Sequence, residues 1–153
     1  MDLRYYQQDA IDAVLKGEGQ WDKQLVVMPT GSGKTICFAH LAQHKLPERT
    51  LILADKEKLV EQACEKIELS TGMIAGREQA QHTADLNNAI VVSSVQTMIN
   101  RLGKWPKDHF RTVVVDEAHH CVADMWQTVL GHFDSHAKVV GFTATPLRSD
   151  KRE

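Results

Sequence analysis

The sequence has little of several features that would narrow its class at once. Its 153 residues carry 18 basic and 20 acidic side chains, and this net charge of −2 excludes a chain that holds nucleic acid by bulk positive charge. The three cysteines, Cys37, Cys64 and Cys121, are an odd number without a close pair, which argues against a disulfide framework and favours a reducing compartment. No apolar run approaches the roughly 20 residues of a membrane-spanning helix, and the polar start shows no signal-peptide core. We therefore expect a cytoplasmic globular domain with no membrane partner.

What the sequence does contain is an alternation of short apolar strands and helical stretches. Hydrophobic residues make up 42% of the chain and charged residues 25%, which is ordinary for one globular domain. Strands are expected at 25–28, 51–54, 89–92, 112–115 and 138–142, and helices at 3–16, about 33–44, 59–67 and 117–130. Residues 70–88 are polar and poorly periodic, so no element is expected there. This order predicts an α/β fold with a mainly parallel central sheet covered on both faces.

The ends of these strands are where a ligand is expected. In open parallel sheets, ligands bind outside the carboxyl ends of the strands. The residues to inspect are therefore those that follow Met28, Ala54, Val92, Val115 and Phe142. Each of these ends carries polar, reactive or glycine-containing sequence, and the acid Asp55 is also the expected N-cap of the next helix.

A glycine-rich loop follows the first strand and opens a helix. The residues of this loop are Met28, Pro29, Thr30, Gly31, Ser32, Gly33, Lys34 and Thr35. The glycines at 31 and 33 allow backbone N–H groups to turn inward and hold phosphate oxygens, and the helix N-terminus adds a positive dipole. Lys34 supplies a mobile cation for the β- and γ-phosphates, and the hydroxyl of Thr35 can coordinate Mg²⁺. The loop therefore predicts a nucleoside-triphosphate site.

Two acidic residues follow the apolar strand that ends at Val115. Asp116 can hold Mg²⁺, directly or through water, beside Thr35, and Glu117 can orient and deprotonate the attacking water. Phosphoryl transfer needs mainly positioning and neutralisation of charge, and these groups supply both. We therefore predict Glu117 and Lys34 as the catalytic residues, with Thr35 and Asp116 as the metal ligands.

Each motif also has a simpler interpretation. The loop could be a glycine-rich turn that contains Lys34 by chance, and Met28 stands where the phosphate-loop pattern usually begins with glycine. Asp116 and Glu117 could merely cap the following helix. Either interpretation is reasonable for one motif alone, but the occurrence of both motifs at strand ends favours a nucleotide site.

Taken together, the motifs resemble those of superfamily 2 helicases and translocases over essentially the whole chain. PTGSGKT at 29–35 resembles motif I, DEAH at 116–119 resembles the DEAH form of the Walker B motif, and TATP at 143–146 resembles motif III. Further similar segments are 3–11 (the adenine-recognising Q-type motif), 50–62 (motif Ia) and 94–97 (the segment that contacts the nucleic-acid backbone). The similarity is greatest to the branch that includes the motor subunits of type I and type III restriction enzymes and related repair helicases.

This resemblance implies a three-layer P-loop NTPase fold of the RecA-like type, with ATP and Mg²⁺ as cofactors. It implies that Arg4 and Gln7 recognise adenine, and that the triphosphate is held by Pro29, Thr30, Gly31, Ser32, Gly33, Lys34 and Thr35. It implies that the state of the nucleotide is coupled to the nucleic-acid side by His119, Thr143 and Thr145. The residues that it implies in contact with nucleic acid are Ser94, Gln96 and Thr97. DNA is favoured over RNA as that nucleic acid.

The resemblance also implies that residues 1–153 form a helicase ATP-binding domain, the first of two RecA-like domains. The second domain, which supplies arginine fingers, is absent from this chain and is expected in the parent chain or in a partner. Because an arginine finger contributes roughly 10³–10⁵ in rate, we expect weak hydrolysis and no unwinding by the chain alone. Two alternatives remain, namely a restriction or remodelling motor that translocates without unwinding, and a binding module that uses ATP as a switch with little turnover.

Histidines and tryptophans have both a functional and a structural interpretation. The candidate groups for a zinc site are His119 with His120 and Cys121, and His132 with His136. The cysteine has no CxxC companion, so surface or core positions are the expected alternative. The tryptophans that could stack bases are Trp21, Trp105 and Trp126. Packing is their expected role, because they are isolated from one another.

Overall fold

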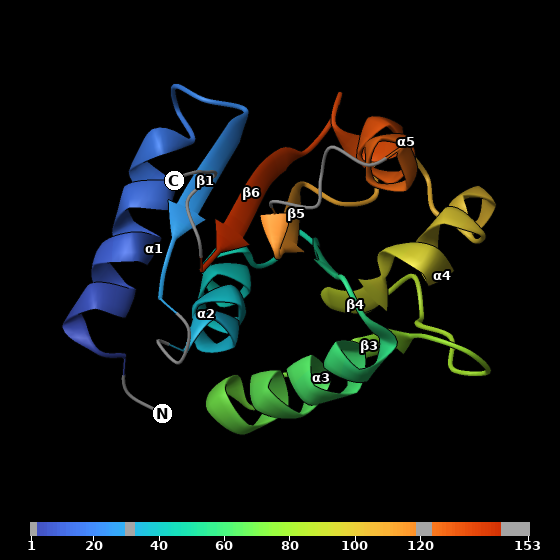
Figure 1. The fold of residues 1–153 in the computed structure, drawn as a ribbon, viewed down its shortest axis with the longest axis horizontal. Coiled ribbons are helices and arrows are strands. Elements are labelled where there is room, and N and C mark those ends of the chain that lie inside the picture. The colour runs from blue at the N-terminus through green and yellow to red at the C-terminus, as the bar shows by residue number, and fades with distance from the viewer. Residues whose placement is uncertain (1–2, 30–32, 119–123, 145–153) are drawn as a thin grey trace, which may run out of the picture.

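The structure is a computed structural model that describes residues 3–29, 33–118 and 124–144. Within these residues, six strands form one sheet in the order β1-β6-β5-β2-β4-β3, and all neighbouring strands are parallel (Figure 1). The strands are β1 (Lys23–Val27), β2 (Thr50–Ala54), β3 (Gly76–Glu78), β4 (Ile90–Ser94), β5 (Thr112–Asp116) and β6 (Lys138–Thr143). The helices are α1 (Tyr5–Gly17), α2 (Lys34–Lys45), α3 (Glu57–Thr71), α4 (Val95–Ile99) and α5 (Asp124–Phe133), with a short 3₁₀-helix at Leu102–Lys104. Among the helices of the described residues, none combines the length and the apolar character that crossing a membrane requires.

The central strands carry apolar side chains on both faces because both faces are covered. Every residue of β2 and of β4 is buried. One face of the sheet packs against α1, α2 and α3 and includes Ile52, Val92 and Val114. The other face packs against α4 and α5 and includes Leu53 and Val113. Figure 1 shows the two sets of helices on opposite sides of the sheet. The predicted three-layer α/β fold with a parallel sheet is therefore confirmed.

Strand β1 lies at one end of the sheet and pairs with β6. Lys23 is opposite Val139 and Val27 is opposite Thr143. The N–H of Met28 donates to the carbonyl oxygen of Thr143 at 2.9 Å, which extends the pairing beyond the strand. Exposed and half-buried residues alternate along β1, so one of its faces packs against α1 and the other faces solvent.

Strand β3 was not expected, because it lies in the polar stretch 70–88. Its last residue, Glu78, has an exposed fraction of 0% and forms ion pairs with Arg101 and Lys104. Burial of a carboxylate requires such partners. The strand therefore contains no apolar run that could reveal it, and its place in the sheet depends on charged residues that follow it in the chain.

Helix limits also differ from the expected ones. Helix α3 begins after Lys56, which is its N-cap in place of the expected Asp55. Helix α4 follows β4 without a break, since the strand's last residue, Ser94, is also the N-cap of the helix. The helix expected over 117–130 is described only from Asp124, and it continues to Phe133.

The parallel topology places all strand ends of one kind at the same edge of the sheet. We call one edge the carboxyl edge, which is formed by the last strand residues Val27, Ala54, Glu78, Ser94, Asp116 and Thr143. The opposite edge, which we call the amino edge, is formed by the first strand residues Lys23, Thr50, Gly76, Ile90, Thr112 and Lys138. Helices α2 and α3 begin at the carboxyl edge, so the phosphate loop and the acid pair of the sequence lie on the same side of the molecule.

Candidate functional site

Lys34 lies at the carboxyl edge between two acidic side chains. Its Nζ is 2.7 Å from Glu117 Oε1 and 3.3 Å from Asp116 Oδ1. The lysine begins α2, which follows β1, whereas Asp116 is the last residue of β5. Only β6 separates these two strands in the sheet. The fold therefore brings Lys34 of the predicted phosphate loop and the acid pair together, although they are far apart in the chain.

Lys34 is shared between two acidic side chains, and the group is largely buried. Lys34 and Asp116 are largely buried, with exposed side-chain fractions of 16% and 17%. Burial raises the pKa of Asp116 above its ordinary value, and the charge of Lys34 opposes this only in part. Burial by itself would lower the pKa of Lys34, but the hydrogen bond to Glu117 and the charge of Asp116 outweigh it and raise that pKa. Lys34 therefore carries a positive charge at neutral pH. A further positive charge nearby would stabilise the ionised form of Asp116.

The backbone at Glu117 has a conformation that few residues with a Cβ adopt. Its φ is +57°, in the left-handed region, which costs about 1–2 kcal/mol for a non-glycine residue. The N–H of Glu117 donates to Asp116 Oδ1 at 3.0 Å and holds the turn. On the adjacent strand, a Cβ at Gly141 would lie 2.7 Å from the Cβ of Ala118, so the glycine gives this turn its space. The chain thus turns sharply where β5 ends and presents both carboxylates to Lys34.

The start of α2 is fixed against α1 through a glycine. Gly33 is the N-cap of α2 and has a φ of +81°. A Cβ at this position would collide with Nε2 of Gln7, which makes a long contact of 3.5 Å with the carbonyl oxygen of Gly33. Gln7 is buried, and its Oε1 accepts a hydrogen bond from the N–H of Arg4 at 2.9 Å. The predicted adenine-recognising residue Gln7 therefore lies beside the predicted phosphate loop.

Thr35 and Asp116 line one small cavity of about 80 Å³ between α2, α3 and the sheet. A hydroxyl and a carboxylate are hard oxygen ligands of the kind that Mg²⁺ prefers. Gln62 and Lys66 of α3 line the same cavity from the other side. The two predicted metal ligands are therefore brought together, and their donor atoms fit Mg²⁺.

The structure describes only some of the other residues that are predicted to bind the nucleotide or to couple it to nucleic acid. Pro29 is exposed, and the guanidinium of Arg4 donates to the hydroxyl of Tyr6 at 3.0 Å. Thr143 is buried at the end of β6, and its carbonyl oxygen accepts the hydrogen bond from Met28 that was described above. Thr143 therefore borders the start of the phosphate loop. The predicted residues that lie outside the described part of the chain are Thr30, Gly31, Ser32, His119 and Thr145.

The residues predicted to contact nucleic acid lie at the other half of the carboxyl edge, where β4 ends. Gln96 is exposed, whereas Ser94 has an exposed fraction of 0%. The hydroxyls of Ser94 and Thr97 both donate to Oε1 of Glu57, in the first turn of α3. Sequence reasoning missed Glu57. Its place shortly after the carboxyl end of a strand is the signal that could have found it.

The histidine and tryptophan alternatives are resolved where the structure describes them. His132 Nε2 lies 2.7 Å from the carbonyl oxygen of Trp105, and His136 lies beyond the end of α5. Trp105 and Trp126 are buried in the core, whereas Trp21 is 57% exposed. Over residues 3–29, 33–118 and 124–144, no group of three or more histidine, cysteine or acidic side chains could hold a metal ion. Because Trp105 and Trp126 are buried in the core, their role is packing.

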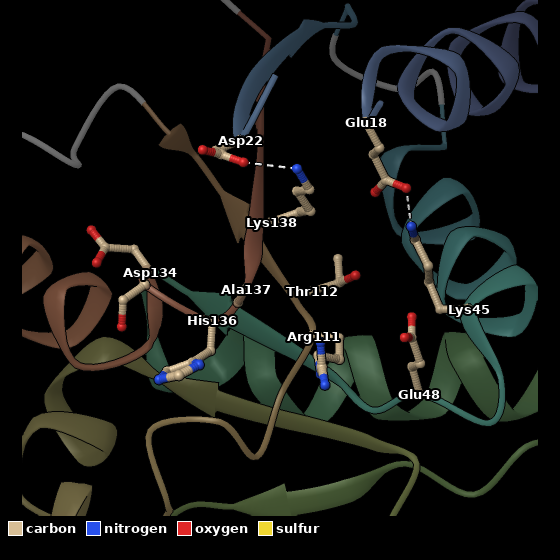
Figure 2. Close-up of a pocket in the computed structure, with 11 residues that line it drawn as sticks. Glu18, Asp22, Lys45, Glu48, Arg111, Thr112, Asp134, His136, Ala137 and Lys138 are labelled. Atoms are coloured by element: carbon tan, nitrogen blue, oxygen red, sulfur yellow. Dashed lines mark hydrogen bonds and ion pairs between the residues drawn. The ribbon is translucent and has the colours of Figure 1, made fainter. Parts of the chain in front are cut away.

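A larger pocket of about 360 Å³ lies at the amino edge, opposite the candidate site (Figure 2). Two ion pairs line it. One joins Glu18, which follows α1, to Lys45 at the end of α2. The other joins Asp22 to Lys138 at 2.7 Å. Figure 2 shows both pairs, with one acid facing each lysine. None of the residues predicted from the motifs lines this pocket.

Comparison with known proteins gives matches over almost the whole chain. Residues 1–148 match the family described as type III restriction enzyme, res subunit. IRC3 of Saccharomyces cerevisiae, which is named as an ATP-dependent helicase, is 35% identical over 167 residues, which cover 98% of this chain and 24% of IRC3. The type I restriction enzyme EcoKI endonuclease subunit of Escherichia coli is 30% identical, with coverage of 94% of this chain and 15% of that subunit.

Solved structures share the fold. The helicase domain of Hef from Pyrococcus furiosus has a TM-score of 0.78 and 26% identity, and the match covers 95% of this chain and 33% of that one. The chain thus spans about a quarter of the length of IRC3 and a third of the solved Hef chain. The chain belongs to the family of the type III restriction enzyme res subunit, and its fold is that of the first RecA-like domain of superfamily 2 helicases.

Proposed function

We propose that this chain binds ATP and Mg²⁺ at the carboxyl edge and is the ATP-binding motor domain of a DNA helicase or translocase. The observation that carries the proposal is the position of Lys34, whose amine lies 2.7 Å from Glu117 and 3.3 Å from Asp116. One cation and two carboxylates are the charged groups that phosphoryl transfer requires for the phosphates, the metal ion and the attacking water. Membership of a helicase-related family supports ATP as the nucleotide.

The roles of these residues follow from their atoms. The amine of Lys34 would turn from the carboxylates to the β- and γ-phosphate oxygens. Thr35 and Asp116 would hold Mg²⁺, which neutralises charge on the phosphates when it is bound. Once Lys34 has turned away, the carboxylate of Glu117 could accept a proton from the attacking water. The loss of an ion pair on nucleotide binding is thus what makes the base available.

Recognition of the base would fall to α1. Gln7 contacts the carbonyl oxygen of Gly33, so an adenine held by Gln7 would have a fixed relation to the phosphate loop. Arg4 is exposed at the start of the same helix and could act with it. Because the one amide group of Gln7 carries both a hydrogen-bond donor and an acceptor, Gln7 could discriminate adenine from guanine by the pattern of donors and acceptors on the base.

The motor function would require parts beyond this chain. Residues 1–153 would form the helicase ATP-binding domain, and a second RecA-like domain of the parent chain or a partner would close over the nucleotide. His119, Thr143 and Thr145 would couple the nucleotide to the nucleic acid, which Ser94, Gln96 and Thr97 would contact, with DNA favoured over RNA. His119 completes the DEAH form of the Walker B motif. Without the second domain, hydrolysis by the chain would be weak.

Binding and turnover of ATP test this proposal separately. Glu117→Gln should retain MgATP binding and lose about 10²–10⁴ in hydrolysis rate, because the amide cannot accept the proton. Glu65→Gln, an exposed position on α3, is the matched control and should behave as the parent protein. Hydrolysis by Glu117→Gln at the parent rate would refute the general-base role. Strong DNA-stimulated turnover by the chain alone would refute the need for a second domain.

Translocation without strand separation is a second candidate, and the similarity to a type I restriction enzyme subunit favours it. Displacement of a triplex-forming strand by the complete motor, without separation of the duplex, would select translocation over unwinding. A switch module would bind MgATP without turnover even after the second domain is supplied.

The burial of Cys37 and Cys64 as free thiols supports a reducing compartment such as the cytoplasm.

A further inference from the structure

Glu57 links the segments that follow β2 and β4 at the carboxyl edge. It is the first residue of α3, directly after the loop that follows β2. Its Oε1 accepts a hydrogen bond from the hydroxyl of Ser94 and another, of 3.1 Å, from the hydroxyl of Thr97. One carboxylate oxygen therefore binds both hydroxyls that the motif analysis assigns to nucleic-acid contact.

These hydrogen bonds use the donor capacity of both side chains. A hydroxyl has one proton to donate. The hydroxyl of Ser94 gives its proton to Glu57 and accepts from the N–H of Thr97 at 3.1 Å. The hydroxyl of Thr97 gives its proton to the same oxygen. While Glu57 is in this position, neither hydroxyl has a proton left for a phosphate oxygen.

The side chain of Glu57 resembles a phosphate in the respects that matter here. A carboxylate and a phosphate both present anionic oxygens that accept hydrogen bonds. Burial raises the pKa of Glu57, but the hydrogen bonds that it receives, first of all that from Ser94, outweigh burial and lower the pKa. The residue itself is exposed, so the side chain can swing into solvent without disturbing the core.

We propose that Glu57 occupies the place of a nucleic-acid phosphate on Ser94 and Thr97 and must move aside before nucleic acid binds there. The inference rests on the proposed nucleic-acid contact of these two residues. The carboxylate of Glu57 competes with nucleic acid for the hydroxyls of Ser94 and Thr97. It therefore weakens the binding of any nucleic-acid strand that cannot displace it. In the structure the hydroxyl of Ser94 donates to Glu57, so its proton becomes available to a phosphate only when Glu57 leaves.

A purely structural role for Glu57 makes the opposite prediction. If the carboxylate only fastened α3 to α4, its removal would loosen the nucleic-acid segment and weaken binding. The sign of the change in affinity therefore separates the two roles.

The test measures binding of a fluorescent single-stranded DNA oligonucleotide by anisotropy, with the full chain and with MgATP present. Glu57→Gln should bind about tenfold more tightly than the parent protein, and Glu57→Ala at least as tightly as Glu57→Gln, because the competing charge is gone. Glu65→Gln carries the same change in net charge on the same helix and should change affinity less than about twofold. Thr97→Val, added to Glu57→Gln, should reverse most of the gain.

Each remaining outcome has a definite meaning. Unchanged or weaker binding by Glu57→Gln, with a thermal unfolding midpoint equal to that of the parent, overturns the competitor role. An equal gain in Glu65→Gln also overturns it, because the effect would then come from net charge. If the parent protein and all variants bind no oligonucleotide, the proposed nucleic-acid contact itself fails. That result would be distinct from a parent that binds and a Glu57 variant that does not improve.

Discussion

The two edges of the sheet balance their charges in different ways. At the carboxyl edge, Lys34 contacts both Asp116 and Glu117, so one cation is shared by two carboxylates. The backbone at Glu117 is also in the left-handed region. Buried charged groups that shift each other's pKa and strained backbone are both costly for folding, and both are typical of functional sites.

At the amino edge, the lysines that line the large pocket each have an acid of their own. Lys45 pairs with Glu18 and Lys138 pairs with Asp22. The first pair joins the ends of α1 and α2, and the second joins the start of β6 to the residue that precedes β1. The comparison teaches that pocket size does not select the candidate site, since both lysines of the larger pocket already have a carboxylate partner. The smaller cavity is the one that brings the hydroxyl of Thr35 and the carboxylate of Asp116 together.

Replacement of one lysine at each edge should give the largest difference in MgATP affinity between two variants. Lys34→Ala should weaken MgATP binding roughly 10²-fold or more, because the phosphates lose their cation and face two unneutralised carboxylates. Lys45→Ala, the matched change at the amino edge, should leave MgATP affinity unchanged. Titration with a fluorescent ATP analogue measures both. Equal losses in the two variants would remove the distinction between the edges.

Two glycines with positive φ should differ in how much stability the protein loses when each is replaced by alanine. Gly33, at the carboxyl edge, has a φ of +81° and no room for a Cβ beside Gln7, whereas Gly72, at the end of α3, has a φ of +75° and open space. Gly72→Ala should lower the free energy of unfolding by about 1 kcal/mol. Gly33→Ala should lower it by about 1–3 kcal/mol, and addition of Gln7→Ala should restore part of the loss. Equal values for both glycines in urea unfolding would show that Gln7 does not constrain the loop.

The ion pair between Glu18 and Lys45 should contribute to stability and not to nucleotide binding. The two side chains are 13% and 12% exposed, so solvent screens them little. Glu18→Gln should lower the free energy of unfolding by about 1–2 kcal/mol, because the hydrogen bond loses its charge. MgATP affinity should not change. A weaker affinity for MgATP in this variant would mean that the amino edge acts on the candidate site.

The smallest effect is expected for the exposed pair of the amino edge. Asp22 is 83% exposed, and its hydrogen bond and charge interaction with Lys138 lower its pKa. A lowered pKa means that any stabilisation by the pair is present at neutral pH and is lost as the pH falls into the acid range. Because solvent screens such a pair, urea unfolding of Asp22→Asn should match that of the parent at pH 7. A measurable difference there would show that the pair is a structural part of this edge.

Much of the fold could be predicted from the sequence because the central strands are apolar runs. Leu51–Ala54 is buried on both faces of the sheet, and such a segment has few alternatives in an α/β chain. The proximity of Lys34 to Asp116 could also be expected, since both follow strands and the strand ends of a parallel sheet meet at one edge. These expectations depend on local pattern and on a general rule of topology.

The remaining features depend on contacts between distant residues, which no local pattern records. Strand β3 pairs with β4 although it ends in Glu78, because Arg101 and Lys104 neutralise the buried carboxylate. The left-handed turn at Glu117 needs the space beside Gly141. The bond between Glu57 and Ser94 forms because β2 and β4 are neighbours, and the order of strands in a sheet cannot be read from their sequences.

The pairing of β1 with β6 has a consequence for how the chain is made. In the described part of the chain, β6 is the only strand next to β1, yet it lies near the opposite end of the sequence. A ribosome releases β1 long before β6, so Leu25 and Val26 have no sheet partner until most of the domain has emerged. We expect the domain to close late in synthesis, and chains that terminate before Lys138 to be open to aggregation and proteolysis.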